Sequence, residues 1–450
     1  MFRFTRHVSL VALITAIVLV SAPALAQTLV IEGGTVHTMT GEPFQGRVVI
    51  TNGIITAVGP DVSAPPGATR IDASGMHVYP GLFDAMSTLG LTEIGAVSAT
   101  NDQAEMGLYN PHLNAATAIH PSSELIPVTR ANGLTHAIVA PRSARGGVIA
   151  GQAALVNLDG WTVEEMAIDV SVAMVINWPA IVTRSFDFTT FSYKSKPFND
   201  AKEEAEKKQN ELRDWMEAAR HYQQAKGAER SRADVDHKLA ALAECLDGKK
   251  QVIIQANAKR DIEGAIGFAE EYGLKMILAG GRDAWKVKDT LAEKKIPVIL
   301  GKTQSMPREE DDPYDRPFVN PSELHQAGIR IAFSSGAGGG FSGSPHTSRT
   351  LPYEAATAMA FGLPAEDAMK ALTLWPAEIL GVSDRIGSIE PGKIANVIVT
   401  DGSPLEITSN VHHLIIAGNE VATENKHRSL YEKYRSRPLP KPAAALEASR

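Results

Sequence analysis

The stretch KQVIIQANAKRDIEGAIGFAEEYGLKMILAGG, residues 250–281, decides the fold class. Two short apolar runs, QVIIQAN and LKMILAGG, stand at its ends. Between them, apolar residues recur at helical spacing: Ile262, Ala265, Ile266, Ala269 and Tyr272. Gly273 follows as a helix stop signal. A strand, a helix and a strand at this spacing predict a βαβ unit whose parallel sheet is buried on both faces.

Similar apolar runs recur through the middle of the chain: THAIVAP (135–141), IPVILG (296–301) and IRIAFSSG (329–336). A long series of such units favours an α/β fold with a TIM-like (β/α)8 barrel over an open doubly wound sheet. No G-x-G-x-x-G motif follows any of the runs, which argues against a dinucleotide-binding domain.

The two ends of the chain have a different pattern. Short alternating runs between Thr28 and Val78, separated by Gly, Asn and Pro, predict β-hairpins, and matching runs cover 387–402 and 411–422. We therefore expect both ends to build one small β-sandwich, residues 27–79 plus 386–425, with the barrel inserted over residues 80–385. A C-terminal tail would cover residues 426–450.

The first 26 residues are typical of a secretory signal peptide. Arg3 and Arg6 precede an apolar run that is shorter than the roughly 20 residues needed to span a bilayer, and Ala24-Leu25-Ala26 forms a cleavage pattern. We expect secretion to the periplasm of a Gram-negative bacterium, with no membrane attachment after cleavage. Because Cys245 is the only cysteine, the chain can form no internal disulfide.

Charge and composition narrow the class of ligand. The formal charge of -7 comes with no cluster of Lys and Arg, which argues against nucleic acid and favours a small molecule. Residues 200–238 are rich in charges around a narrow apolar stripe, which predicts an amphipathic helix packed on the barrel or, alternatively, a partner-binding helix. The Gly-rich stretch 336–343 predicts a mobile lid, and it lacks the ending of a phosphate-binding loop.

Several segments in this order resemble the amidohydrolase superfamily, particularly its secreted imidazolonepropionase-like members. They are PGLFD (80–84), RANGLTHAIVAP (130–141), GGVIAGQAALV (146–156), the run from Thr373 to Gly381, and residues 387–404. The resemblance covers nearly the whole mature chain. It implies a composite fold of a barrel and a β-sandwich, with residues 146–156 in loops over the active site. It also implies zinc or another divalent metal that activates water to attack a carbon–nitrogen bond.

The same resemblance places other residues where the family's metal ligands belong: Met86, Thr88, Gln255, Arg282, Ser335 and Gly336. Thioether, hydroxyl and amide groups are poor ligands for zinc, and a guanidinium repels a divalent ion. No histidine elsewhere forms a His-x-His or His-x-x-x-His pair at a strand mouth. We therefore predict that the protein has no metal cofactor.

The first functional hypothesis is a catalytically impaired ligand-binding or partner subunit. Arg282 beside Gln255, Thr88 and Ser335 would suit a carboxylate ligand, because a guanidinium binds one with two parallel hydrogen bonds. The alternative is that Arg282 only pairs with Asp283 or Asp84. From the resemblance we also expect a homodimer, or a heterodimer with an active relative.

Two other functions stay open at this point. The chain could be an active hydrolase of non-peptide carbon–nitrogen bonds, in cyclic amides or dipeptide-like substrates, with Asp84 as the base or with a metal held by unexpected donors. It could also be a purely structural envelope protein. The retained segment 146–152 and the Gly-rich lid argue against this last function, because a scaffold has no need of them.

Overall fold

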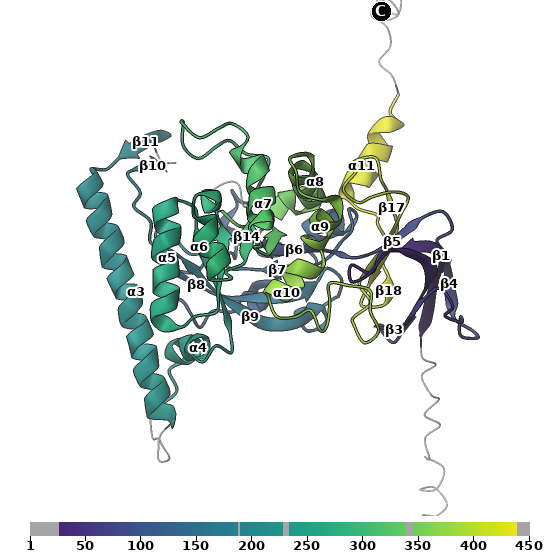
Figure 1. Ribbon diagram of the computed structural model, residues 1–450, viewed down its shortest axis with the longest axis horizontal. Helices are drawn as coiled ribbons and strands as arrows, with labels where there is room; N and C mark the ends of the chain where they lie inside the picture. The colour runs from purple at the N-terminus through teal and green to yellow at the C-terminus, as the bar shows by residue number, and fades with distance from the viewer. Residues whose placement is uncertain (1–26, 188–189, 228–233, 339–344, 439–450) are drawn as a thin grey trace, which may run out of the picture.

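The computed structural model describes residues 27–187, 190–227, 234–338 and 345–438. The predicted signal peptide and most of the predicted lid lie outside these residues. Figure 1 shows three parts side by side: a long helix, a central barrel with its helices, and a separate sheet.

The central part is a nearly closed barrel of eight strands among the described residues. Their order around the barrel is β15 (Ile331–Phe333), β14 (Val298–Leu300), β13 (Met276–Gly280), β12 (Gln251–Ala256), β9 (Ala167–Asn177), β8 (Ile149–Asn157), β7 (Leu134–Val139) and β6 (Leu82–Ser87). The last strand returns to the first, because the backbone N–H of Gly336 donates to the carbonyl of Met86 at 2.7 Å. The predicted barrel is confirmed.

Strand β8 differs from the rest of the barrel because it runs antiparallel to both β7 and β9. Most of its side chains are buried, so residues 149–156 form a barrel wall rather than the loops that the resemblance implied. An apolar run carries no information about strand direction. The short loops before and after β8 allow hairpin pairing without a crossover helix.

The helix predicted within residues 250–281 is α5 (Lys259–Tyr272). It ends at Gly273, which has a φ of 64° and caps the helix in the left-handed region. The other α-helices described in the barrel region are α1 (Leu125–Arg130), α2 (Val163–Met166), α4 (His237–Leu246), α6 (Lys288–Glu293), α7 (Arg316–Gln326), α8 (Leu351–Ala360), α9 (Ala365–Lys370) and α10 (Leu374–Ile379).

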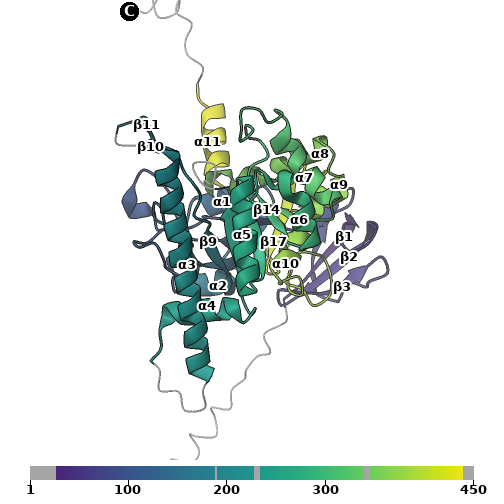
Figure 2. The same ribbon diagram turned by 60° about the vertical axis from the view of Figure 1, so that its left-hand side comes forward.

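The charged segment forms α3 (Phe198–Gly227), preceded by a hairpin of β10 (Arg184–Asp187) and β11 (Ser192–Ser195). Leu212, Met216 and Ala219 of its apolar stripe are fully buried, so the predicted amphipathic helix is confirmed, although it ends earlier than residue 238. Figure 2 shows α3 running beside α5, and the Arg213–Glu271 ion pair joins them at 3.0 Å. Within the described chain, no helix is both long and apolar enough to cross a membrane.

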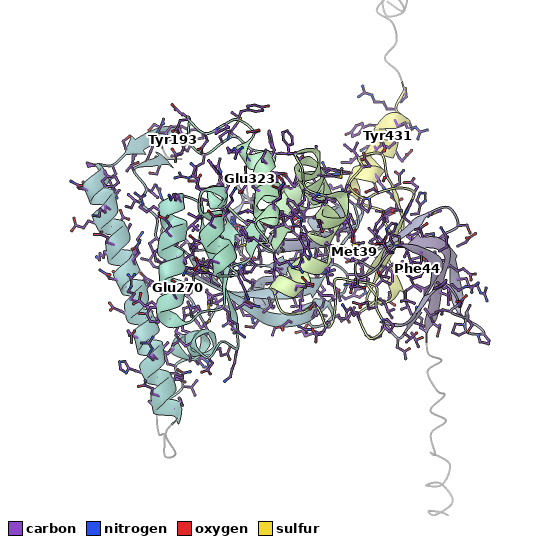
Figure 3. All side chains as sticks on the ribbon, in the orientation of Figure 1. Met39, Phe44, Tyr193, Glu270, Glu323 and Tyr431 are labelled. Atoms are coloured by element: carbon purple, nitrogen blue, oxygen red, sulfur yellow. The ribbon has the colours of Figure 1, made fainter. Side chains whose placement is uncertain are left out.

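Strands from both chain ends form one sheet, as predicted. The strands are β1 (Thr28–Val36), β2 (Phe44–Thr51), β3 (Ile54–Gly59), β4 (Thr69–Asp72), β5 (His77–Pro80), β16 (Val397–Thr400), β17 (Val411–Ile416) and β18 (Asn419–Glu420). β5 pairs with β16, which joins the two ends. The final helix, α11 (Lys426–Arg435), has no buried residue, and Figure 3 shows its Tyr431 on the outside of the molecule.

Gly81 joins the terminal sheet to the barrel between β5 and β6. Its backbone N–H donates to the carbonyl of Asn396 at 2.9 Å. A β-carbon added at Gly81 would lie 2.0 Å from the hydroxyl oxygen of Thr135 and 2.3 Å from its methyl group. The two parts of the fold can therefore meet here only through a residue without a side chain.

We expect Gly81→Ala to lower the free energy of unfolding by about 2 kcal/mol or more, because the added methyl must displace the buried Thr135. Gly267→Ala in α5 is the matched control. Its β-carbon meets no atom within 4 Å, so it should leave the free energy of unfolding unchanged or raise it by up to about 1 kcal/mol. Urea denaturation measures both, and equal stability of the two variants would contradict the account of this joint.

Candidate functional site

A cavity of about 300 Å³ opens where the carboxyl ends of β6, β9, β12 and β15 meet. We call it the mouth cavity. Its walls come from those strand ends and from the loop that follows β7, and its lining residues are Met86, Ser87, Asn177, Gln255, Gly336 and residues 142–147. The carboxyl ends of barrel strands are where active sites lie in folds of this kind, so this cavity is the first candidate for a ligand site.

Three of the residues selected from the sequence meet in the mouth cavity: Met86, Gln255 and Gly336. The Met86 side chain is buried, and the Gln255 amide makes no hydrogen bond to another described residue. A β-carbon on Gly336 would lie 2.7 Å from the Met86 carbonyl oxygen. No side chain fits at position 336 unless β6 and β15 move apart.

The structure places Arg282 away from these residues. Its guanidinium donates to the carbonyl of Met306 at 2.6 Å, and it lines a separate cavity of about 30 Å³ together with Lys302, Arg308 and Asp312. Burial and the nearby Arg308 guanidinium lower the pKa of Arg282. The expected cluster of Arg282 with Gln255, Thr88 and Ser335 around one cavity is therefore not formed.

The backbone explains the placement of Arg282. The two glycines before it, Gly280 and Gly281, have φ values of 94° and 61° and turn the chain sharply at the end of β13. The pairing of Arg282 with Asp283 is not found either, because the Asp283 carboxylate pairs with Lys286 at 3.4 Å and with Arg308 at 3.3 Å.

Thr88, another residue predicted from the sequence, is buried, and its hydroxyl has no hydrogen-bond partner among the described residues.

Among the described residues, the cations that line the mouth cavity are Arg142 and Arg145, which were not among the residues predicted from the sequence. Arg145 is exposed and makes no ion pair with a described residue, and burial lowers the pKa of Arg142. Asn177 donates to the Ser143 hydroxyl at 2.7 Å and so holds their loop against β9. The signal in the sequence is RSARGG, a basic, Gly-containing segment directly after a strand.

Asp84 lies beneath the mouth cavity, fully buried between β6 and β15. One carboxylate oxygen accepts from the backbone N–H of Ser335 at 3.0 Å, and the other accepts from the Ser335 hydroxyl at 2.5 Å. Ser335 also lies 2.8 Å from the hydroxyl of Ser348 and 3.1 Å from that of Ser87. Burial outweighs these hydrogen bonds and raises the pKa of Asp84 to about 6.

The donor groups around the mouth cavity are neutral or cationic. Among the described residues that line it there is no Asp, Glu, His or Cys. Across the described ranges, no three side chains of these types gather where they could hold a metal ion. A larger neighbouring cavity, about 610 Å³, shares Arg142 and is lined by Glu93, Asp102 and Glu105.

Comparisons with known proteins agree with this architecture. Residues 316–421 match the sequence profile described as "Amidohydrolase family". The crystal structure of an amidohydrolase from Thermotoga maritima MSB8 is 27% identical, covers 88% of this chain and 99% of its own, and superposes with a TM-score of 0.73. A prolidase complexed with N-methylphosphonate-L-proline has 18% identity, with a TM-score of 0.54 over 88% of this chain and 99% of that chain, and shares the fold.

A curated relative found by sequence similarity is also named an amidohydrolase. "Amidohydrolase tasK" of Hapsidospora irregularis is 22% identical over 391 residues, which are 80% of this chain. The chain spans 38% of the length of that protein.

The raised pKa of Asp84 predicts a pH-dependent stability. Because its folded pKa of about 6 lies above the ordinary 3.8, its contribution is fully present below pH 4 and is lost as the pH rises through 6. A shift of this size corresponds to about 3 kcal/mol. Asp84→Asn keeps the acceptor for the backbone N–H of Ser335 and has no charge to bury. The free energy of unfolding of the wild type, relative to this variant, should therefore fall by about 2 kcal/mol between pH 4 and pH 7.

Urea denaturation of both proteins at pH 4, 5, 6 and 7 measures this difference. Parallel pH profiles for the wild type and Asp84→Asn would show that the Asp84 carboxyl is not perturbed as described.

Proposed function

The chain belongs to the amidohydrolase superfamily, and from this premise we propose that it is a catalytically impaired member that binds a small carboxylate in the mouth cavity. The observation that carries the proposal is that two guanidinium groups line the cavity, with no acidic side chain among the described residues around it.

The donor chemistry of the mouth does not fit the divalent metal of the superfamily. A catalytic zinc site needs about three protein donors, chiefly imidazole, thiolate or carboxylate. The groups lining the cavity are the Met86 thioether, the amides of Gln255 and Asn177, and serine hydroxyls. These are weak ligands for zinc, and the charges of Arg142 and Arg145 repel a dication. This mismatch supports the proposal that the metal site is lost.

The same groups suit an anion. Guanidinium groups bind a carboxylate through paired, charge-assisted hydrogen bonds, and Arg142 and Arg145 come from one short loop that brings both to the cavity. The Gln255 side-chain amide, which has no hydrogen-bond partner among the described residues, adds a donor from β12. A volume of about 300 Å³ is at the small end of ligand pockets, which favours a compact ligand.

The alternative of an active hydrolase rests on Asp84, since a carboxyl with a pKa of about 6 is suited to general base catalysis. Its geometry argues for a different role. Asp84 has no exposed surface, and both of its oxygens accept hydrogen bonds from Ser335. We propose that Asp84 is a positioning residue that fixes β15 against β6 below the ligand.

Secretion to the periplasm and pairing with a second copy or an active relative are further parts of the proposal, and they rest on the sequence alone. If the chain is a partner subunit, an intact barrel without metal chemistry is sufficient for that role. Purification of the native protein strictly as a monomer from its own extract would contradict the pairing.

Calorimetric titration with acetate, succinate and N-acetylglycine tests the carboxylate proposal. We expect saturable binding of at least one of them and none of N-acetylglycinamide, the neutral counterpart of N-acetylglycine. Arg142→Gln and Arg145→Gln should each weaken binding at least tenfold, equivalent to about 1.4 kcal/mol, because each removes a charged donor. Arg437→Gln, an exposed arginine in the tail, is the matched control and should bind like the wild type.

Two results would contradict the proposal. One is that none of the three carboxylates binds. The other is that one binds equally well to the wild type and to the protein in which both Arg142 and Arg145 are glutamine.

A further inference from the structure

A further cavity, about 450 Å³ in volume, lies between the middle of α3 and the start of α4. We call it the α3–α4 cavity. It is separate from the mouth cavity and shares no lining residue with it. Its lining consists of two aromatic rings, three carboxylates and two small apolar contacts: Tyr109, Trp215, Glu211, Asp214, Asp236, Ala218 and Leu239.

The two aromatic rings form a fixed surface in this cavity. Tyr109 and Trp215 stack with their centroids 5.9 Å apart and their planes 26° from parallel. The Tyr109 hydroxyl donates to the Glu211 carboxylate at 2.8 Å, which holds its ring in place. The faces of such rings carry partial negative charge and attract cations.

The cavity already shows this attraction within the chain. The Lys238 ammonium lies 5.5 Å from the centroid of the Trp215 ring and donates to the Tyr109 carbonyl at 3.1 Å. An amine therefore fits the edge of the aromatic pair, on the side of α4.

The carboxylates leave the cavity with excess negative charge. Glu211, Asp214 and Asp236 line the cavity, and the Lys238 ammonium lies at its aromatic edge, with the His112 and His237 imidazoles close to Lys238 and Asp236. Asp214 makes no hydrogen bond or ion pair with a described residue. Burial holds the pKa of the Tyr109 phenol well above its usual range, and the Glu211 and Asp214 carboxylates raise it further.

We propose that the α3–α4 cavity binds a small organic polycation of the polyamine class. One ammonium group would contact the aromatic pair, and a second would pair with Glu211 and Asp214. An anion is disfavoured by the three carboxylates, and a bare metal ion would make no use of the rings. The volume is within the range of small-molecule sites.

Calorimetric titration of the full chain with spermidine tests the proposal. We expect saturable binding of one spermidine per chain. Asp214→Asn combined with Glu211→Gln should weaken it at least tenfold, and Trp215→Leu at least fivefold. Glu203→Gln, an exposed carboxylate on the same helix outside the cavity, is the matched control and should bind like the wild type. Circular dichroism melting checks that each variant is folded. If the double variant or Trp215→Leu is destabilised, Asp214→Asn alone, at an exposed position, tests the contribution of the carboxylates.

Competition separates a specific site from general surface charge. Mg²⁺ should displace spermidine poorly at equal charge concentration, because it gains no contact with the rings. The proposal is overturned if spermidine does not bind saturably, or if Mg²⁺ competes as well as spermidine and Trp215→Leu binds like the wild type. Tetramethylammonium carries a single charge. If it bound as tightly as spermidine, the assignment to polycations would be overturned.

Discussion

The contact between β6 and β15 is the constraint on which the mouth of this barrel depends. The Gly336 backbone donates to the Met86 carbonyl, and the buried Asp84 carboxylate accepts from Ser335, so the first and last strands are joined at both points. This closure leaves no volume for a side chain at position 336 and uses the Asp84 carboxylate inside the wall. The chemistry of the mouth cavity is consequently left to amides, hydroxyls, backbone groups and the loop 142–147.

Charge is unevenly distributed over the molecule. The chain as a whole has a formal charge of -7, yet the described residues that line the mouth cavity include two arginines and no acid. The neighbouring larger cavity and the α3–α4 cavity are lined by carboxylates. Clefts with walls of one sign concentrate ligands of the opposite sign, so local lining decides the ligand more than net charge does. The three cavities are thus suited to different ligands, and the mouth is the one suited to an anion.

The fold could be predicted from the sequence because its signals are local. Apolar runs and a helical period identified β12, α5 and β13, and alternating runs identified the sheet that joins the chain ends. The direction of β8 could not be predicted, because an apolar run reads the same in parallel and antiparallel pairing. Only the part of the site that lies at strand ends could be predicted from the sequence. Met86, Gln255 and Gly336 belong to this part, and they line one cavity.

The other site residues depend on tertiary structure. Arg282 follows two glycines with positive φ, and the direction of that turn is not encoded in a pattern of residue types. Arg142 and Arg145 belong to a loop whose position is set by contacts with β9, and only the fold shows that they meet Gln255.

The claim that the mouth holds no catalytic dication is tested most directly by crystals of the protein purified without chelators and grown with zinc. Anomalous scattering at the zinc edge would locate any bound ion. We predict no peak at bonding distance from Met86, Asn177 or Gln255. A fully occupied zinc among those side chains would contradict the claim.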